Sequence, residues 1–206
     1  MKHTLTALAL SLGLTASIPA WADLTSLTPE APKPSFASMS LTDLQAAAQG
    51  GDVRAQFFLA TRYKLGQGVP QDMQQAFAWY KKAADQGAAP AQLNIGQMYA
   101  QGKGVAQNID QAKVWFGKAA KQGDNRASYN LALIEERDQN LADAYQWYDL
   151  SARDGMLDAR IKDKAQGKIR TLAANLSPQD IQDAKNRADR WIQTDDANST
   201  GNSSNK

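Results

Sequence analysis

The segment AFAWYKKAADQG (residues 76–87) returns as AKVWFGKAAKQG at 112–123 and, more loosely, as AYQWYDLSARDG at 144–155. Each form begins with alanine, continues with tryptophan and a second aromatic residue, has small residues near its end and closes with glycine. These apolar positions are spaced 3, 4, 7 and 8 residues from the first, which places them on one face of an α-helix. Each segment is therefore predicted to be an amphipathic helix that ends at glycine.

A second recurring segment lies before each of these helices. Residues 55–60 (AQFFLA) match 91–96 (AQLNIG) and 127–132 (ASYNLA), at a constant offset of 36. A helix is predicted from about Val53 to Tyr63 in the first copy, with Ala55 and Leu59 on its inner side. A period of 36 indicates stacked helix pairs, and not a globule around one core.

The turn inside each copy also recurs. Residues 66–69 (GQGV) match 102–105 (GKGV), and glycine permits the positive φ of a tight turn. Asp72 and Asn108 follow as predicted N-caps, with glutamine three residues on as in a capping box. The third copy has residues 134–140 (IEERDQN) where the loop would be, so the sequence leaves its turn geometry open.

These motifs resemble the Sel-1-like repeat, a relative of the tetratricopeptide repeat. The resemblance covers copies at about 52–87, 88–123 and 124–155. It implies an all-α fold, an α-α superhelical solenoid of helix-turn-helix repeats with capping helices at its ends.

The flanking segments are predicted to cap and extend this solenoid, which we place at 40–193. A helix over 41–50 resembles a shortened second helix of a repeat, and helices within 157–193 close the other end. Ser177 and Pro178 supply an N-cap and a first helical residue. Residues 23–39 are predicted to be an extended linker and residues 194–206 a disordered polar tail.

The first 22 residues have the pattern of a secretory signal peptide. A basic start precedes an apolar run over 5–14, and Ala20-Trp21-Ala22 fits a small-x-small cleavage site. We expect cleavage after Ala22 and a periplasmic protein, with secretion or an uncleaved N-terminal anchor as alternatives. The apolar run is short for a membrane span.

The composition excludes several chemistries. The chain has no cysteine and its only histidine is His3, inside the predicted signal peptide. Cysteine nucleophiles, disulfides and cysteine or histidine metal sites are therefore excluded from the body of the chain. The net charge of +2 gives no footprint for nucleic acid. We expect no catalytic residue, metal or cofactor, because the usual catalytic groups, cysteine and histidine, are missing after the predicted signal peptide. The two Gly-x-Gly stretches follow predicted helices and lack the rest of a phosphate loop, so they are interpreted as turns.

The surface created by stacking is the best candidate for function, because solenoids bind partners on a concave face lined by one helix per repeat. A 100° helical wheel selects the solvent side of the first helix of each copy. The predicted partner-binding residues are Arg54, Phe58, Thr61, Arg62, Asn94, Gln97, Met98, Arg126, Asn130 and Leu133.

Phe58 stands out in this set, since the equivalent residues are Asn94 and Asn130. An exposed aromatic residue among polar equivalents is a candidate binding hot spot. The alternative is that Phe58 packs under the N-terminal linker or the first helix, and the sequence leaves both open. The recurring tryptophans Trp79, Trp115 and Trp147 are interpreted as core, because they hold the same inward position in each copy.

The resemblance implies a non-catalytic adaptor, since family members hold protein partners in a superhelical groove. Exported bacterial relatives serve envelope assemblies such as secretion, motility and export machines. We therefore expect a periplasmic scaffold with envelope protein partners, and no binding of nucleic acid. Two alternatives remain: a module that binds peptidoglycan or another glycan, and a cell-wall or β-lactam hydrolase. The β-lactam association belongs to cysteine-rich relatives, and this chain lacks the cysteines.

Overall fold

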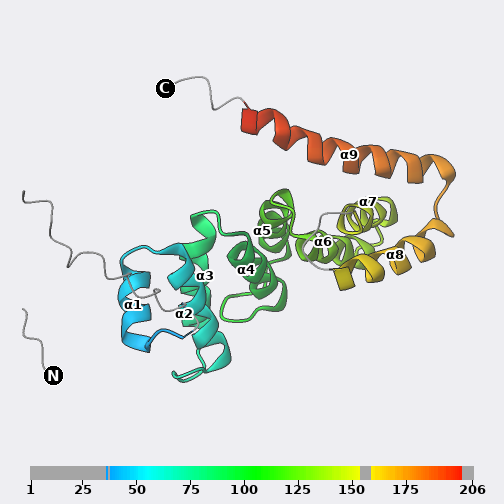
Figure 1. Ribbon diagram of the computed structural model, residues 1–206. Coiled ribbons are helices and arrows are strands. Elements are labelled where there is room, and N and C mark those ends of the chain that lie inside the picture. The colour runs from blue at the N-terminus through cyan, green and yellow to red at the C-terminus, as the bar shows by residue number, and fades with distance from the viewer. Residues whose placement is uncertain (1–35, 37, 154–158, 201–206) are drawn as a thin grey trace, which may run out of the picture. The chain divides into compact units, whose positions relative to one another are not determined.

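The computed structural model describes residues 36, 38–153 and 159–200, without side chains after Trp191. The predicted signal peptide and most of the linker lie outside these residues. Within them all regular structure is helical (Figure 1): α1 (Leu41–Gln49), α2 (Val53–Leu65), α3 (Met73–Asp85), α4 (Ala89–Gln101), α5 (Ile109–Lys121), α6 (Asn125–Arg137), α7 (Leu141–Ser151), α8 (Ala159–Ala173) and α9 (Pro178–Thr200).

The helices pack as consecutive pairs, which confirms the predicted fold class. Pairs α2–α3, α4–α5 and α6–α7 form the three repeats. The second helix of each pair also packs on the helix that follows it: α3 on α4, α5 on α6 and α7 on α8. The first helix of the first repeat is longer than the sequence indicated. Helix α2 ends at Leu65, beyond Tyr63, because Gly66 adopts a left-handed φ of 70° and its N–H donates to the carbonyl of Arg62.

The second helix of each glycine-loop repeat begins at the predicted cap. The Asp72 carboxylate accepts hydrogen bonds from the N–H groups of Gln74 and Gln75, and the Asn108 side chain accepts one from Gln111. A capping box would return a bond from the Gln75 side chain to the Asp72 N–H. That N–H donates instead to the Tyr63 carbonyl at 2.9 Å, so the preceding helix satisfies the cap.

The core is built from small residues facing large rings. The first alanine of each recurring segment, Ala76, Ala112 and Ala144, is fully buried, and Tyr80, Phe116 and Tyr148 are at most 1 % exposed. Such close contact leaves no room at Gly96, where an added Cβ would lie 2.6 Å from the Phe116 ring. The predicted packing role of the tryptophans is confirmed, since Trp79, Trp115 and Trp147 all pack in core clusters.

Buried glutamines connect successive pairs through hydrogen bonds. Gln56 in α2 donates to the Ala48 carbonyl at the end of α1, and accepts from Gln86 at the end of α3. The same arrangement recurs 36 residues later. The Gln92 side chain donates to the Ala84 carbonyl, and the Gln122 side chain donates to that of Gln92. Because Gln56 and Gln92 are about 95 % buried, these bonds remove the cost of leaving their amides unsatisfied.

Helices α8 and α9 cover the last repeat. Lys168 of α8 pairs with Glu136 at 2.8 Å, and Trp191 of α9 packs edge-on against Trp147 with ring centroids 4.8 Å apart. Ser177 caps α9 as predicted, its hydroxyl accepting from the Asp180 N–H. The helix continues to Thr200, into the stretch expected to be a disordered tail. Its polar residues extend a helix that is already anchored at its start.

Candidate functional site

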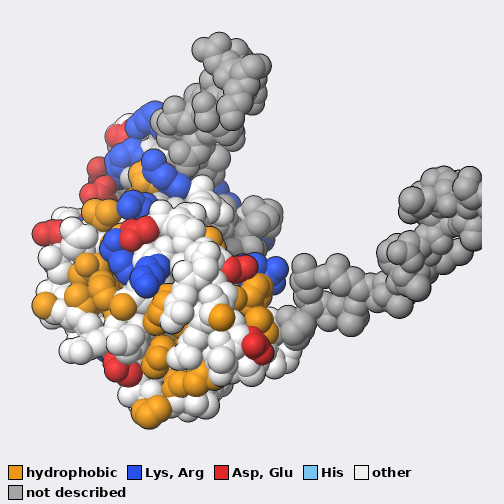
Figure 2. Space-filling view, turned by 90° about the vertical axis from the view of Figure 1, so that its left-hand side faces the viewer, with side chains coloured by type: hydrophobic (Ala, Val, Ile, Leu, Met, Phe, Trp, Pro, Cys, Tyr) orange, Lys and Arg blue, Asp and Glu red, His pale blue; other side chains and the backbone are white. Residues whose placement is uncertain are grey.

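The outward side of α2 and α4 carries two hollows. The first, here the apolar hollow, has a volume of about 210 Å³ and lies between α2 and the start of α4. It is lined by Val53, Arg54, Phe57, Phe58, Ala88 and Pro90. Figure 2 views the molecule from the end where α1 lies and shows hydrophobic patches beside a group of lysine and arginine side chains. The apolar hollow brings together two predicted site residues, Arg54 and Phe58.

Phe58 is half-buried and is held from two sides. The Phe36 ring stacks on it with centroids 6.1 Å apart, and Phe57 meets it edge-on at 5.7 Å. Arg54 extends over Phe36, its guanidinium carbon 5.4 Å from the ring centroid. Phe58 also packs against the Leu44 cluster of α1. Of the two interpretations of Phe58, the structure supports packing under the end of the linker and the first helix.

Two further predicted site residues have structural partners. The Thr61 hydroxyl donates to the Phe57 carbonyl and lies 2.9 Å from the Tyr80 hydroxyl. Arg62 donates to the Met39 carbonyl, which ties the end of the linker to α2. Burial raises the pKa of Tyr80, and the hydrogen bond with Thr61 only partly offsets this. Thr61 and Arg62 therefore stabilise the first repeat through these hydrogen bonds.

The second hollow, here the lysine hollow, has a volume of about 260 Å³ and lies beside α4. It is lined by Lys64, Met73, Asn94, Gln97, Met98, Gln101 and Lys103. Three of the predicted residues, Asn94, Gln97 and Met98, meet here. Placing Met98 on the solvent side was wrong, because it is only 4 % exposed and packs in the core cluster with Ile95 and Trp115. Its flexible thioether fills the floor between α3 and α4.

The charge in this hollow comes from Lys64 and Lys103. The Lys64 ammonium donates to Asn94 Oδ1 at 2.8 Å and lies 6.0 Å from the centroid of the Tyr80 ring. Burial, and then the positive charge of Lys103, lower the pKa of Lys64. Among the residues that the structure describes, no carboxylate lines this hollow. The lysine hollow thus combines a partly desolvated cation with polar amides and a thioether floor.

The third repeat presents a different surface. Arg126 pairs with the buried Asp124 at 2.7 Å, and Asn130 donates to the Arg126 carbonyl. Leu133 is 39 % exposed, as predicted for the solvent side. The binding role of these three residues stays a prediction.

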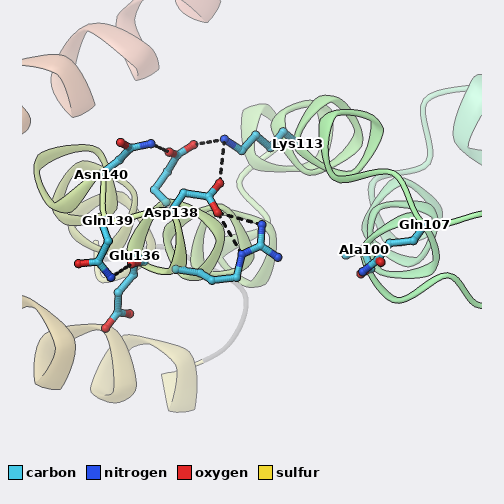
Figure 3. Close-up of polar contacts among 9 residues, drawn as sticks. Ala100, Gln107, Lys113, Glu136, Asp138, Gln139 and Asn140 are labelled. Atoms are coloured by element: carbon cyan, nitrogen blue, oxygen red, sulfur yellow. Dashed lines mark hydrogen bonds and ion pairs between the residues drawn. The ribbon is translucent and has the colours of Figure 1, made fainter.

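The turn of the third repeat holds a polar network that sequence analysis did not foresee (Figure 3). Lys113 of α5 reaches across to Glu135 at 2.8 Å and to Asp138 at 3.9 Å, and the Asn140 side chain donates to Glu135. Glu136 points the other way, toward α8. The signal for this network was available, because Lys113 occupies the position of Phe77 in the first repeat.

The lysines of the lysine hollow were also missed. Lys64 lies one residue past the end that the sequence indicated for its helix, and Lys103 lies between the glycines of a loop interpreted only as a turn. Neither position belongs to the wheel that selected the candidate site. In the described residues no group of three or more acidic or histidine side chains is arranged to hold a metal ion.

Comparison with known families decides the assignment. The model of the Sel1 repeat matches residues 53–87, 89–124 and 126–156. The chain belongs to the Sel1 repeat family. The matched copies begin and end within two residues of those predicted from the period of 36. Sel1 repeats typically bind proteins and are usually non-catalytic.

The chain is also similar to solved structures of bacterial proteins. A Sel1 repeat protein from Oxalobacter formigenes is 34 % identical, covers 62 % of this chain and 97 % of its own, and superposes with a TM-score of 0.51. A protective antigen of uropathogenic Escherichia coli with an SLR fold is 25 % identical over 73 % of this chain and 40 % of its own, with a TM-score of 0.45.

Cysteine rich protein B of Helicobacter pylori is 30 % identical over 42 % of this chain and 65 % of its own, with a TM-score of 0.40. A search of curated proteins finds no match. In the part of the chain that the structure describes, every helix is too short or too polar to cross a bilayer.

Proposed function

We propose that this Sel1 repeat protein is an exported, non-catalytic scaffold that holds a protein partner on the outward side of α2, α4 and α6. The partner is an envelope protein, and the compartment is the periplasm. The predicted signal peptide over residues 1–22 supports export, and the family supports protein binding. A role in an envelope assembly such as a secretion, motility or export machine follows from this location.

The observation that carries the proposal is the contrast between inward and outward positions of the same helices. Inward positions repeat, as in Ala55, Ala91 and Ala127, because each copy packs alike. No outward position keeps the same residue type in all three copies: Arg54, Pro90 and Arg126; Phe58, Asn94 and Asn130; Thr61, Gln97 and Leu133. The two hollows open among these varied residues. A uniform framework with a varied face is suited to recognising one partner by shape and local contacts.

The test is site-specific cross-linking in the native cell envelope. A photoreactive benzoylphenylalanine replaces Leu133 on α6 and, as a matched control, Val114 on α5. Both residues are large, apolar and exposed, at 39 % and 50 %. We expect a discrete protein adduct from position 133 and none from position 114, because only α6 belongs to the proposed face.

Other outcomes would overturn the proposal in different ways. Recovery of muropeptides without protein from position 133 would make the chain a glycan-binding module. Turnover of cell-wall or β-lactam substrates by the purified chain would make it an enzyme. Equal adducts from both positions would show that the outward face is not selective.

A further inference from the structure

Lys64 and Lys103 of the lysine hollow differ from three other lysines in the described part of the chain, which pair with carboxylates. Lys81, Lys113 and Lys168 each pair with a carboxylate at 2.6–2.8 Å. Lys64 has an amide as its partner, and it faces a second cation, Lys103. The described ion pairs include neither Lys64 nor Lys103. A carboxylate that entered this hollow would relieve the repulsion between the two ammonium groups.

Nearby acidic groups are already engaged. Met73 lines the hollow. The carboxylate of the residue before it, Asp72, accepts hydrogen bonds from two N–H groups at the start of α3. Among the lining amides, Asn94 donates to the Pro90 carbonyl and accepts from Lys64. The side-chain amides of Gln97 and Gln101 make no hydrogen bond with another described residue, so they are available to a ligand. Two cations and two amide donors suit a group that only accepts hydrogen bonds.

We propose that the lysine hollow binds the carboxylate of an acidic side chain presented by the protein partner. This inference rests on the proposed function and names the chemistry of one contact within it. The apolar hollow lies on the same helix, since Pro90 lines one hollow and Asn94, one turn later, lines the other. A peptide that carries an apolar and an acidic side chain spans both, whereas a free small anion uses only one.

The helix sets the spacing of such a peptide. Pro90 and Asn94 are separated by about 6 Å along the axis of α4. In an extended peptide, side chains two positions apart lie on the same face at about 6.6 Å. The segment recognised therefore has an apolar residue and an acidic residue two positions apart, so that both side chains face α4.

The experiment is an NMR titration of the full chain, labelled with ¹⁵N. The probe is a capped Gly-Ser hexapeptide with leucine and glutamate two positions apart, and a second peptide replaces the glutamate with glutamine. Sodium acetate and inorganic phosphate form two further arms. We expect the glutamate peptide to shift the backbone amide signals of Gln97, Gln101 and Lys103 and to bind about tenfold more tightly than the glutamine peptide.

Variants locate the charge that matters. Lys64→Met and Lys103→Met keep most of the side-chain length and remove the cation, and each is expected to weaken binding of the glutamate peptide about tenfold. Lys185→Met on α9 removes the same charge from an exposed site elsewhere and leaves the affinity unchanged. Thermal midpoints of all variants show whether the fold is kept. Should Lys64→Met unfold the chain, Lys103→Met still provides the test, because Lys103 is exposed.

The possible outcomes separate this inference from the proposed function. Equal affinity for the two peptides, or no shifts up to millimolar peptide, would overturn the carboxylate site while leaving cross-linking at Leu133 intact. Binding of acetate or phosphate as tight as the peptide would replace the acidic peptide with a free anion as ligand. If cross-linking at position 133 fails but the glutamate peptide is still preferred, the proposed envelope scaffold is contradicted and the carboxylate site is supported.

Discussion

The interface between repeats one and two and that between repeats two and three use the same positions for different chemistry. In the first, Phe77 of α3 meets Tyr99 of α4 edge-on, with centroids 5.3 Å apart. In the second, the equivalent residues are Lys113 and Glu135, which form an ion pair at 2.8 Å. The backbone path repeats, but the contact changes from aromatic to ionic. Both partners change together, so neither interface is left with a mismatched pair.

The turns differ in the same region. The second repeat turns through a glycine loop, where the Gln107 side chain donates to the Ala100 carbonyl at 2.8 Å. The third repeat turns at Asp138–Asn140, and Gln139 adopts a φ of 64° without being glycine. Figure 3 shows both turns and the polar network that surrounds the shorter one. A left-handed residue is thus required in each turn, and the third repeat supplies it at a steric cost.

The largest effect is expected where the glycine loop touches the preceding repeat. A Cβ at Gly104 would lie 2.1 Å from the Met73 carbonyl oxygen, and φ there is 71°. Gly104→Ala should therefore lower the free energy of unfolding by about 3 kcal/mol or more. Urea denaturation followed by circular dichroism measures the loss.

Gly68→Ala is the matched control for this change. Gly68 has nearly the same φ, 73°, but an added Cβ there meets open space. Only the backbone strain remains, which costs about 1 kcal/mol. Equal losses at the two glycines would show that the loop does not press on α3.

The ion pair between repeats two and three should be sensitive to the loss of one partner. Lys113→Phe leaves Glu135, whose side chain is only 12 % exposed, with Asn140 as its remaining polar contact. We expect a loss of about 1–3 kcal/mol in the free energy of unfolding. The double variant Lys113→Phe with Glu135→Tyr recreates the Phe–Tyr pair of the other interface, and it should recover most of the lost free energy of unfolding. A double variant no better than the single one would show that the turn, and not the pair, dictates the chemistry.

Replacing the strained residue of the third turn should stabilise the protein. Gln139→Gly removes the cost of a left-handed glutamine, offset in part by greater freedom of the unfolded chain. The expected gain is about 0.5–1 kcal/mol in the free energy of unfolding. Gln67→Gly, in a loop residue outside the left-handed region, controls for added flexibility and should give no gain. A loss at Gln139 would indicate that its side chain contributes more than its strain costs.

The smallest effect concerns the ionic contact with the C-terminal cap. Burial alone would raise the pKa of Glu136, but hydrogen bonds from Lys168 and Tyr148 and the Lys168 charge outweigh it and lower the pKa below its usual 4.5. A carboxylate with a lowered folded pKa stabilises above its unfolded pKa and loses that contribution as the pH falls through the folded value. The stability difference between the natural chain and Glu136→Gln should be constant above about pH 5 and shrink below 4.5. A difference that grows with acidity would contradict this sign.

The repeat pattern predicted most of the fold because each packing position recurs in sequence. The caps at Asp72 and Asn108 and the left-handed Gly87 all follow from residue types whose local chemistry is short-ranged. The conformation of Gln139 did not follow, since nothing in its own side chain selects a positive φ. The surrounding network of the third turn holds it there.

The candidate site was predicted less well, because a helical wheel places residues around one helix and ignores its neighbours. Met98 lies at the margin of the solvent side of α4 and is buried because neighbouring helices supply Tyr80, Trp115 and other residues of its core cluster. Phe58 is covered by Phe36, more than 20 residues away in the chain. Lys64 and Lys103 come together through the path of a loop, which the wheel does not describe.

The buried glutamines make the solenoid directional. Gln56 and Gln92 each donate a hydrogen bond to a backbone carbonyl at the end of the preceding helix. Each also accepts a hydrogen bond from a glutamine at the end of the following helix. At the equivalent position the third repeat has Ser128, which has no side-chain amide to make these two hydrogen bonds. A duplicate of residues 88–123 inserted after Gly123 would extend the series by one unit, because its glutamine at the position of Gln92 could donate to the carbonyl of Ala120, the equivalent of Ala84. The glutamine series therefore ends at the third repeat because the donor is missing there.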